Sequence, residues 1–178
     1  MVESESEENP DCVRCHMPAY TSRGSLEAYR SLHPKARRIC DAVIAEEDHS
    51  LLFGYRSDEK QDDLYALGRT IPGPNATPEK PLGDIVTNAK GGESTHNFLY
   101  EDEEGRGGTT IDFTPYPIDF KDRVRYARLA GRFMQEAARQ GVPSVWGGDW
   151  DGDGIPGFKD ADERLYDPGH IEFKIMED

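Results

Sequence analysis

The sequence has few of the residues that cross-link a chain, anchor it in a membrane or attract nucleic acid. Only 3 of its 178 residues are cysteine, which excludes a disulfide framework as the organising principle. It has no run of about 18 apolar residues, and its start lacks the basic and apolar segments of a signal peptide, so we expect neither a membrane span nor a visible export signal. Asp and Glu number 35 against 21 Lys and Arg, and the net charge of -14 disfavours nucleic acid and anionic lipid as partners.

The residues that are present fit one folded domain behind an acidic segment. A chain of 178 residues with 35% hydrophobic residues can form one ordinary domain with a core, but not two. Residues 1–24 are acidic and interrupted by prolines, which predicts a flexible N-terminal arm, and residues 25–178 are expected to form a single domain. The N-terminal arm contains Cys12-Val13-Arg14-Cys15-His16, a pattern that leaves open haem attachment, a local disulfide, a partial metal site or no role.

The hydrophobic pattern predicts an α+β fold with a small antiparallel sheet and flanking helices, because helices and strands mix without a regular βαβ period. Helices are expected at residues 25–30, 34–47, 58–68 and 119–140, and strands at 51–55, 85–87, 110–113 and 170–175. The proline-rich connection 71–83 and the acidic, glycine-rich connection 99–107 are expected to be loops. Cys40 lies on the apolar side of the second helix and is predicted to be a core residue.

Histidine is scarce, and only two of the five histidines have neighbours that indicate metal chemistry. His16, His33 and His49 lie in the N-terminal arm, beside a proline and in an acidic turn, and we expect them to be solvated. His96 and His170 lie beside carboxylates in stretches that turn apolar, and two histidines with one carboxylate are a common ligand set for catalytic zinc. Such a site leaves one position for a water whose pKa falls to about 7. From spacing alone, two unrelated histidines explain the pattern as well, since no H-E-x-x-H sequence is present.

A series of short motifs, in order from about residue 51 to 175, resembles one known family. The motifs are Gly54-Tyr55-Arg56-Ser57, Gln61, Leu64 to Thr70, Ile85 to Lys90, Ser94-x-His96-Asn97-Phe98, Gly108-x-Thr110-x-Asp112-Phe113, Trp146 to Trp150 and Asp167-x-x-His170-x-Glu172-Phe173. Together they resemble the L-alanyl-D-glutamate endopeptidases of phage endolysins and bacterial wall-remodelling enzymes, which belong with the VanY-like D-alanyl-D-alanine carboxypeptidases. The resemblance implies the α+β fold of the hedgehog and D-alanyl-D-alanine peptidases. It also implies zinc-dependent cleavage of peptidoglycan stem peptides by zinc-bound water, most specifically at the L-Ala–D-Glu bond.

The family pattern S-x-H-x-x-G-x-A-x-D, followed later by D-x-x-H, implies a role for each matching residue. The two histidines and the first aspartate bind zinc, and the acid of D-x-x-H acts as general base. Carried over by position, the implied zinc ligands are His96, Asp112 and His170, and the implied base is Asp167. Arg56 matches an arginine near the substrate carbonyl, where a fixed cation stabilises the developing oxyanion, and a salt bridge at a strand–helix corner is the alternative. Ser94 and Gln61 match as supporting residues.

The chain departs from the family pattern by two inserts and one substitution. Residues 75–83 and 99–107 lengthen two connections, and Thr110 replaces the alanine of the pattern. A loop can leave and rejoin a site at modest entropic cost, so the second insert is compatible with a joint site for His96 and Asp112. It could instead cover the cleft as a lid, and either insert could change which cross-linked substrate fits.

Residues 149–160 have the spacing of a calcium-binding loop, D-x-D-x-D-G-x-x-x-x-x-D, with Asp in place of the usual final Glu. The predicted calcium ligands are four carboxylates and one backbone carbonyl: Asp149, Asp151, Asp153, Asp160 and Ile155. An acidic solvated turn is the alternative, and Asp149 also belongs to the family's Gly-Gly-Asp-Trp segment. Calcium bound here would order the segment that leads to Asp167 and His170.

The sequence thus predicts a monomeric zinc peptidase with a calcium site that acts at the cell wall on peptidoglycan stem peptides. A D-alanyl-D-alanine carboxypeptidase of the same fold is the rival among enzymes, because the zinc motif does not choose the bond. The rivals of other classes are a non-catalytic, calcium-dependent wall-binding module and a haem protein built on Cys12, Cys15 and His16. A phage lysin released from the cytoplasm and a host enzyme with a trimmed export signal would present the same chain.

Overall fold

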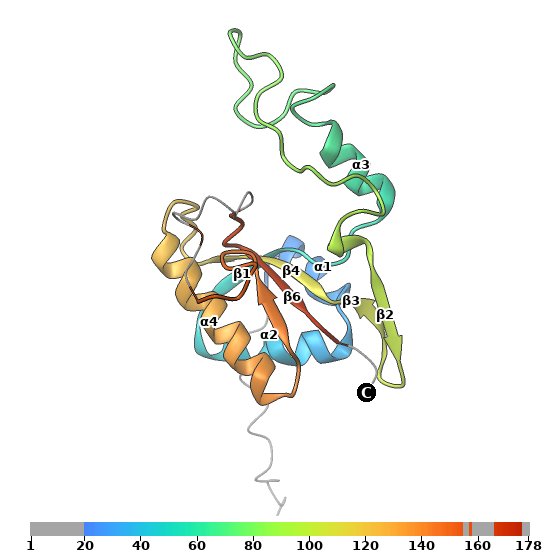
Figure 1. Ribbon diagram of the computed structural model, residues 1–178, viewed down its shortest axis with the longest axis vertical. Coiled ribbons are helices and arrows are strands. Elements are labelled where there is room, and N and C mark those ends of the chain that lie inside the picture. The colour runs from blue at the N-terminus through green and yellow to red at the C-terminus, as the bar shows by residue number, and fades with distance from the viewer. Residues whose placement is uncertain (1–19, 155–156, 158–165, 176–178) are drawn as a thin grey trace, which may run out of the picture.

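The computed structural model describes residues 20–154, 157 and 166–175. A four-stranded antiparallel sheet carries helices on one face, and a long segment built around one helix projects away from it (Figure 1). This architecture confirms the predicted α+β class. The C-x-x-C-H pattern lies outside the described residues, and the division into an N-terminal arm and one domain stays a prediction.

The sheet has the strand order β1, β4, β6, β5, formed by His49–Phe53, Thr110–Pro115, His170–Phe173 and Ser144–Trp146. Successive side chains of a strand point to opposite faces. Ile111 and Phe113 of β4, like Ile171 of β6, are therefore buried in the core under the helices, whereas Asp112 and His170 lie on the other face. The antiparallel register of β4 and β6 sets Asp112 directly opposite His170. The sheet itself thus brings together two residues that are 58 positions apart.

Three helices cover the core face of the sheet. Helices α2 (Pro34–Glu46) and α4 (Arg123–Arg139) pack against each other, and α1 (Arg23–Arg30) packs against β1 (Figure 1). Cys40 of α2 is fully buried in this core, as predicted. Within the described residues, none of the helices combines the length and the apolar character needed to cross a bilayer.

Helix α1 starts at Arg23, near the expected start at Ser25, and Tyr20 before it is buried in the core. The expectation that His33 and His49 are solvated is wrong. His49 is 3% exposed, with its Nε2 2.6 Å from the Tyr20 hydroxyl and its Nδ1 2.8 Å from the Glu47 carbonyl oxygen. His33 is fully buried. Its Nδ1 accepts a hydrogen bond from the amide of Lys35 in the first turn of α2, and its Nε2 lies 3.0 Å from a carboxylate oxygen of Asp102. Both imidazoles are buried rather than solvated because each ring nitrogen has a polar partner.

The insert at 99–107 is a β-hairpin rather than a loop. Its strands β2 (Leu99–Asp102) and β3 (Gly105–Gly108) pair with each other in a separate two-stranded sheet. The carboxylate of Asp102 lies 2.9 Å from the Lys35 ammonium. A Cβ added at Gly107 would lie 2.2 Å from the backbone nitrogen of His33, so the hairpin lies directly against the chain that enters α2. It does not line the cleft described below, and the alternative of a lid is therefore wrong.

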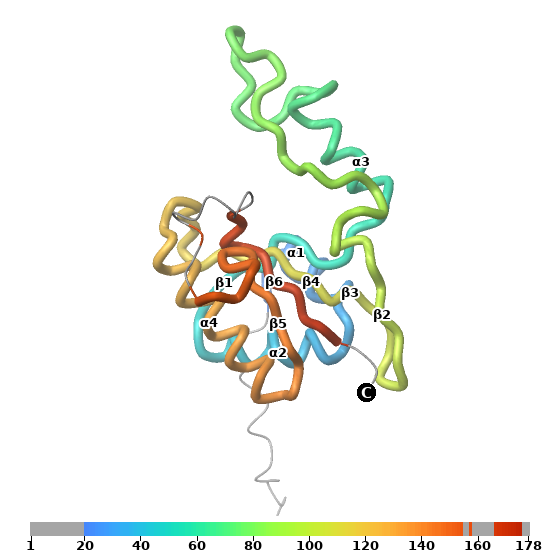
Figure 2. Tube along the Cα trace, in the orientation of Figure 1, coloured from blue at the N-terminus to red at the C-terminus, as the bar shows by residue number. Residues whose placement is uncertain are grey.

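The projecting segment, residues 57–93, is named here the α3 arm (Figures 1 and 2). It contains α3 (Asp58–Ala66), which Ser57 caps as predicted, and the proline-rich connection with the insert 75–83. Residues 85–87 do not form the predicted strand. Side chains rather than a neighbouring strand hold this stretch, since Thr87 accepts hydrogen bonds from Arg69 at its carbonyl oxygen (2.8 Å) and from Gln61 at its Oγ1 (3.2 Å).

Candidate active site

A cleft of about 520 Å³ lies between the α3 arm and the face of the sheet that the helices leave uncovered. Its apolar lining consists of side chains from β1 and the α3 arm: Phe53, Leu64, Ile85 and Val86. The ionisable side chains of β4 and β6, those of the loop before β6 and His96 also line it, and Asp112 lies next to Phe53 in the register of the sheet. The cleft therefore combines converging charged groups with apolar surface that can contact hydrocarbon.

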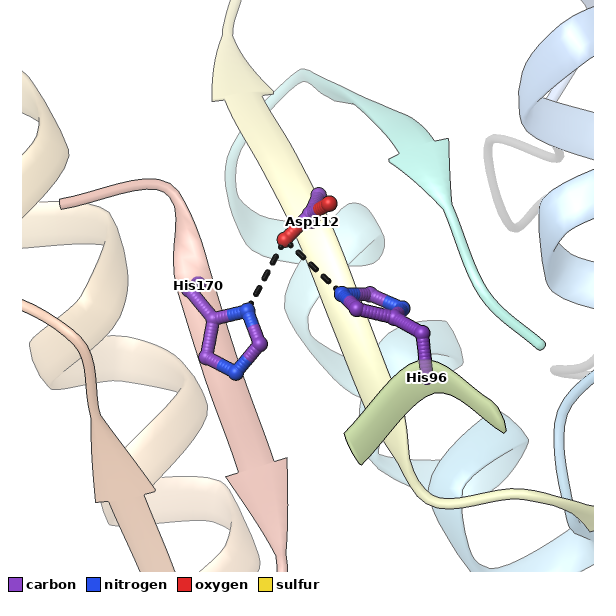
Figure 3. Close-up of side chains that lie close together, drawn as sticks. All are labelled: His96, Asp112 and His170. Carbon is purple, nitrogen blue, oxygen red and sulfur yellow. Dashed lines mark hydrogen bonds and ion pairs between the residues drawn. The ribbon is translucent and has the colours of Figure 1, made fainter. Parts of the chain in front are cut away.

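The three predicted zinc ligands meet in this cleft (Figure 3). His96 comes from the short helix η2 (Thr95–Asn97), which Ser94 caps by accepting the amide of His96. A single carboxylate oxygen, Oδ1 of Asp112, lies 3.0 Å from Nδ1 of His170 and 3.1 Å from Nε2 of His96. The histidines are 7% and 3% exposed. Two strands and a 3₁₀ turn thus bring these groups together, and Ser94 contributes by shaping the turn.

The hydrogen bonds of His96 show that this point favours a cation. Nδ1 of His96 lies 2.6 Å from the carbonyl oxygen of Gly54, so Nδ1 carries the proton of the neutral ring. The opposite nitrogen, Nε2, is then an acceptor that faces the acceptor oxygen of Asp112, and it is buried without a hydrogen-bond partner in the described part of the chain. Only a proton or a metal ion can make this contact favourable. Zinc bonds of about 2.0–2.1 Å in tetrahedral geometry place neighbouring ligand atoms roughly 3.3 Å apart, close to the observed spacing.

The pKa values of these groups reflect the same mutual attraction. Burial raises the pKa of the Asp112 carboxyl, but its interactions with His170 and His96 outweigh burial and bring it below its usual range. Burial lowers the pKa of the His170 imidazole, but Asp112 and then Glu172 outweigh burial and raise it to about 9. Asp112 is therefore held as a carboxylate, and His170 binds a proton more readily than an exposed histidine does.

Arg56 lies next to Asp112 and is held from two sides. Its Nη2 donates to Oδ2 of Asp112 (3.0 Å), and its Nη1 donates to Oε1 of Gln61 (2.7 Å). The guanidinium stacks over the Phe53 ring, 4.4 Å from the ring centroid. Burial lowers the Arg56 pKa, and the Asp112 carboxylate opposes this effect. The salt bridge considered as the alternative role does exist, and it fixes the guanidinium inside the cleft.

Gln61 is fully buried at the base of the α3 arm. Besides accepting from Arg56, its amide nitrogen donates to the carbonyl oxygen of Ala89 (2.8 Å) and to Oγ1 of Thr87 (3.2 Å). One side chain therefore links the cleft arginine to both legs of the α3 arm.

Asp167 lies in the cleft at the turn that precedes β6. Its backbone amide donates to the carbonyl oxygen of Gly147 (2.7 Å), and its own carbonyl oxygen accepts the amide of His170 (3.2 Å). Burial, and secondly the negative charge of Asp112, raise the pKa of the Asp167 carboxyl. Asp167 is thus a fixed carboxylate with more affinity for a proton than an exposed aspartate has.

Glu172 is a cleft residue to which the sequence patterns gave no role. It is 8% exposed, with Oε1 3.5 Å from Nε2 of His170 and Oε2 paired with the ammonium of Lys174. The hydrogen bond to His170 and the charge of Lys174 outweigh burial and lower the Glu172 pKa to about 2. The period of two along β6 was the available signal, because it places residues 170, 172 and 174 on one face.

The acidic segment after β5 brings together the first three predicted calcium ligands. Carboxylate oxygens of Asp149, Asp151 and Asp153 lie within 4.8 Å of one another. Oδ2 of Asp149 accepts the amide of Gly154 (3.1 Å), and its Oδ1 is buried without a partner among the described residues. The other two predicted ligands, Ile155 and Asp160, lie outside the described residues.

Fold and site together define an α+β protein with a candidate His–Asp–His metal centre in an open cleft. No family model matches the chain. Over 131 residues it is 37% identical to the peptidoglycan L-alanyl-D-glutamate endopeptidase CwlK of Bacillus subtilis, a match that covers 67% of this chain and 66%, just under two thirds, of that protein. The crystal structure of the L-Ala D-Glu endopeptidase ChiX of Serratia marcescens has the same fold, with a TM-score of 0.54 and 18% identity over 86% of this chain and 88% of that one. The similarity to CwlK confirms the resemblance seen in the sequence, and the likeness to ChiX confirms the fold.

Proposed function

We propose that this chain is a zinc-dependent peptidoglycan hydrolase that cleaves the L-Ala–D-Glu bond of stem peptides at the cell wall. The observation that carries the proposal is the convergence of His96, Asp112 and His170 on one point of an open cleft. The names of both relatives, which specify L-Ala–D-Glu cleavage, support the choice of bond. Zinc bound there would supply a Lewis acid for the scissile carbonyl and would lower the pKa of water.

Asp167 is the proposed general base. Burial raises the pKa of its carboxyl, so it can take the proton of the attacking water and later give it to the departing amine of D-Glu. The short hydrogen bond from its amide to Gly147 fixes the backbone that presents the carboxylate.

Arg56 is proposed to stabilise the negative charge that develops on the carbonyl oxygen. Its guanidinium is buried and fixed by Asp112 and Gln61, so it needs little reorganisation during the reaction. Its Nε is buried and has no hydrogen-bond partner among the described residues.

The acidic segment after β5 is proposed to bind calcium. The supporting observations are the three clustered carboxylates and the buried, unpartnered Oδ1 of Asp149. Calcium should raise the melting temperature of the unsubstituted protein and have little effect on an Asp151→Asn variant. Equal shifts in both proteins would contradict a calcium site at this segment.

The direct test is mass spectrometry of purified peptidoglycan after digestion with zinc supplied. Asp167→Asn is the test variant, and Asp63→Asn on the exposed side of α3 is the matched control. The proposal predicts new fragments that begin at D-Glu, formed by the control and lost with Asp167→Asn. Loss of terminal D-Ala would instead identify a carboxypeptidase, and binding to the wall without any product would identify a non-catalytic module.

A further inference from the structure

We propose that Glu172 is a positioning residue that orients the His170 imidazole for the metal ion, and that Lys174 holds Glu172 in place. The inference rests on the proposed zinc centre. It concerns a carboxylate that lies in the cleft, belongs to neither candidate metal cluster and has no part in the proposed reaction.

The two nitrogens of His170 face two different carboxylates. Nδ1 lies 3.0 Å from Oδ1 of Asp112, at the point where the candidate ligand atoms meet, while Nε2 lies 3.5 Å from Oε1 of Glu172. If Nδ1 gives its lone pair to a metal ion, Nε2 must carry the proton of the neutral ring. That N–H then needs an acceptor, and an anionic carboxylate is a stronger acceptor than the Thr95 hydroxyl, which is also 3.5 Å away.

The strand geometry explains how Glu172 is aimed at His170. The two residues are two positions apart on β6, so their side chains leave the sheet on the same face. Lys174, two positions further along, pairs with Oε2 of Glu172, which leaves Oε1 for His170. Each carboxylate oxygen thus has its own cationic or N–H partner, and the carboxylate has a fixed orientation.

A purely structural role does not account for a carboxylate at this place. Glu172 is 92% buried beside a cleft that already contains Asp112 and Asp167, where a third negative charge is unfavourable unless cations balance it. An apolar residue would fill the same space without that electrostatic cost. A carboxylate here fixes the ring of His170 and makes Nδ1 a better electron donor to a metal ion.

The test measures zinc affinity by competition with a chromophoric chelator in the unsubstituted protein and in five variants, one of which, His170→Ala, removes a proposed ligand. Glu172→Ala should lower zinc affinity about 10- to 100-fold. Glu172→Gln keeps a neutral acceptor and should lose less, and Lys174→Met should lose less than Glu172→Ala because the carboxylate remains. Glu101→Gln, on the exposed part of the hairpin, is the matched control and should bind zinc as the unsubstituted protein does.

Melting curves of the metal-free proteins show whether each variant folds. If Glu172→Ala does not fold, the zinc affinity of Glu172→Gln is compared with that of the unsubstituted protein instead. A positioning role is supported if zinc affinity falls from Glu to Gln to Ala at position 172 while the stability of the metal-free proteins stays similar. Unchanged zinc affinity in the folded Glu172 variants, with loss in His170→Ala, overturns the inference and leaves the zinc centre intact. A raised KM with unchanged zinc affinity also overturns it, because Glu172 would then contact substrate. Failure of the unsubstituted protein to bind zinc refutes the centre itself and the inference with it.

Discussion

Replacing Gln61 by leucine should destabilise the protein and slow the proposed reaction, because one buried amide links Arg56 to the α3 arm. Leucine fills nearly the same volume, so the packing is largely kept while three hydrogen bonds are lost. The change leaves a charged donor of Arg56 and the carbonyl oxygen of Ala89 without their buried partner.

The structure sets the size of the effect. A hydrogen bond to a charged group contributes about 1.5–3 kcal/mol and a neutral one about 0.5–1.5 kcal/mol. The bond to the Thr87 hydroxyl is the longest of the three and should contribute least. We therefore expect the free energy of unfolding to fall by about 2.5–5 kcal/mol, which for a protein of this size is a drop in melting temperature of roughly 5–20 °C.

Calorimetry and turnover of a stem peptide measure the two consequences separately. Gln135→Leu makes the same chemical change on the exposed face of α4 and should change the unfolding free energy by less than about 0.5 kcal/mol. Gln61→Glu keeps an acceptor for Arg56 but loses the donor to the α3 arm, so it should keep more activity than Gln61→Leu. Equal stability and turnover in Gln61→Leu and Gln135→Leu would refute this reasoning.

Three further predictions concern pH, the hairpin and the metal. Burial lowers the pKa of His49 in the folded protein, so the unfolded chain binds its proton first and stability should fall as the pH drops below about 6.5. His49→Gln should flatten that pH dependence in urea titrations, and an unchanged slope would contradict it. Gly107→Ala should cost about 1–3 kcal/mol in thermal melts, because the added Cβ meets the His33 backbone at 2.2 Å, with catalysis retained since the hairpin lies outside the cleft. When free zinc is present at 100 times its Kd, removing it with a chelator should lower the free energy of unfolding by about 2.7 kcal/mol. An unchanged melting curve after addition of the chelator would argue against the metal centre.

The central strands and the two long helices could be predicted because their signals are local. Alternation in β4 and β6 separates Ile111 and Ile171, which face the helices, from Asp112 and His170, which do not. The caps of α2 and α3 also agree with the sequence, since Pro34 begins one helix and Ser57 caps the other. Each of these features depends on a few consecutive residues.

The errors concern residues whose environment comes from distant parts of the chain. Ile85 and Val86 have the composition of a strand, but the α3 arm offers no strand to pair with, and they remain 54% and 43% exposed. His33 and His49 look like solvated histidines until distant residues, Asp102 and Tyr20, meet their ring nitrogens. The proposed role of Glu172 has no signal in its immediate sequence for a similar reason, because it depends on Asp112, 60 positions away, lying beside His170.

The hairpin explains how the candidate site tolerates an insert between two of its ligands. Spacing alone made a joint site for His96 and Asp112 uncertain, since the insert 99–107 separates them. In the structure Leu99 pairs with Gly108, so the inserted chain leaves and returns at neighbouring positions. His96, just before β2, and Asp112, in the strand that follows β3, therefore still meet at 3.1 Å. Length added as a self-paired hairpin leaves the positions of its ends unchanged, whereas the same length added to β4 would shift the register that sets Asp112 opposite His170.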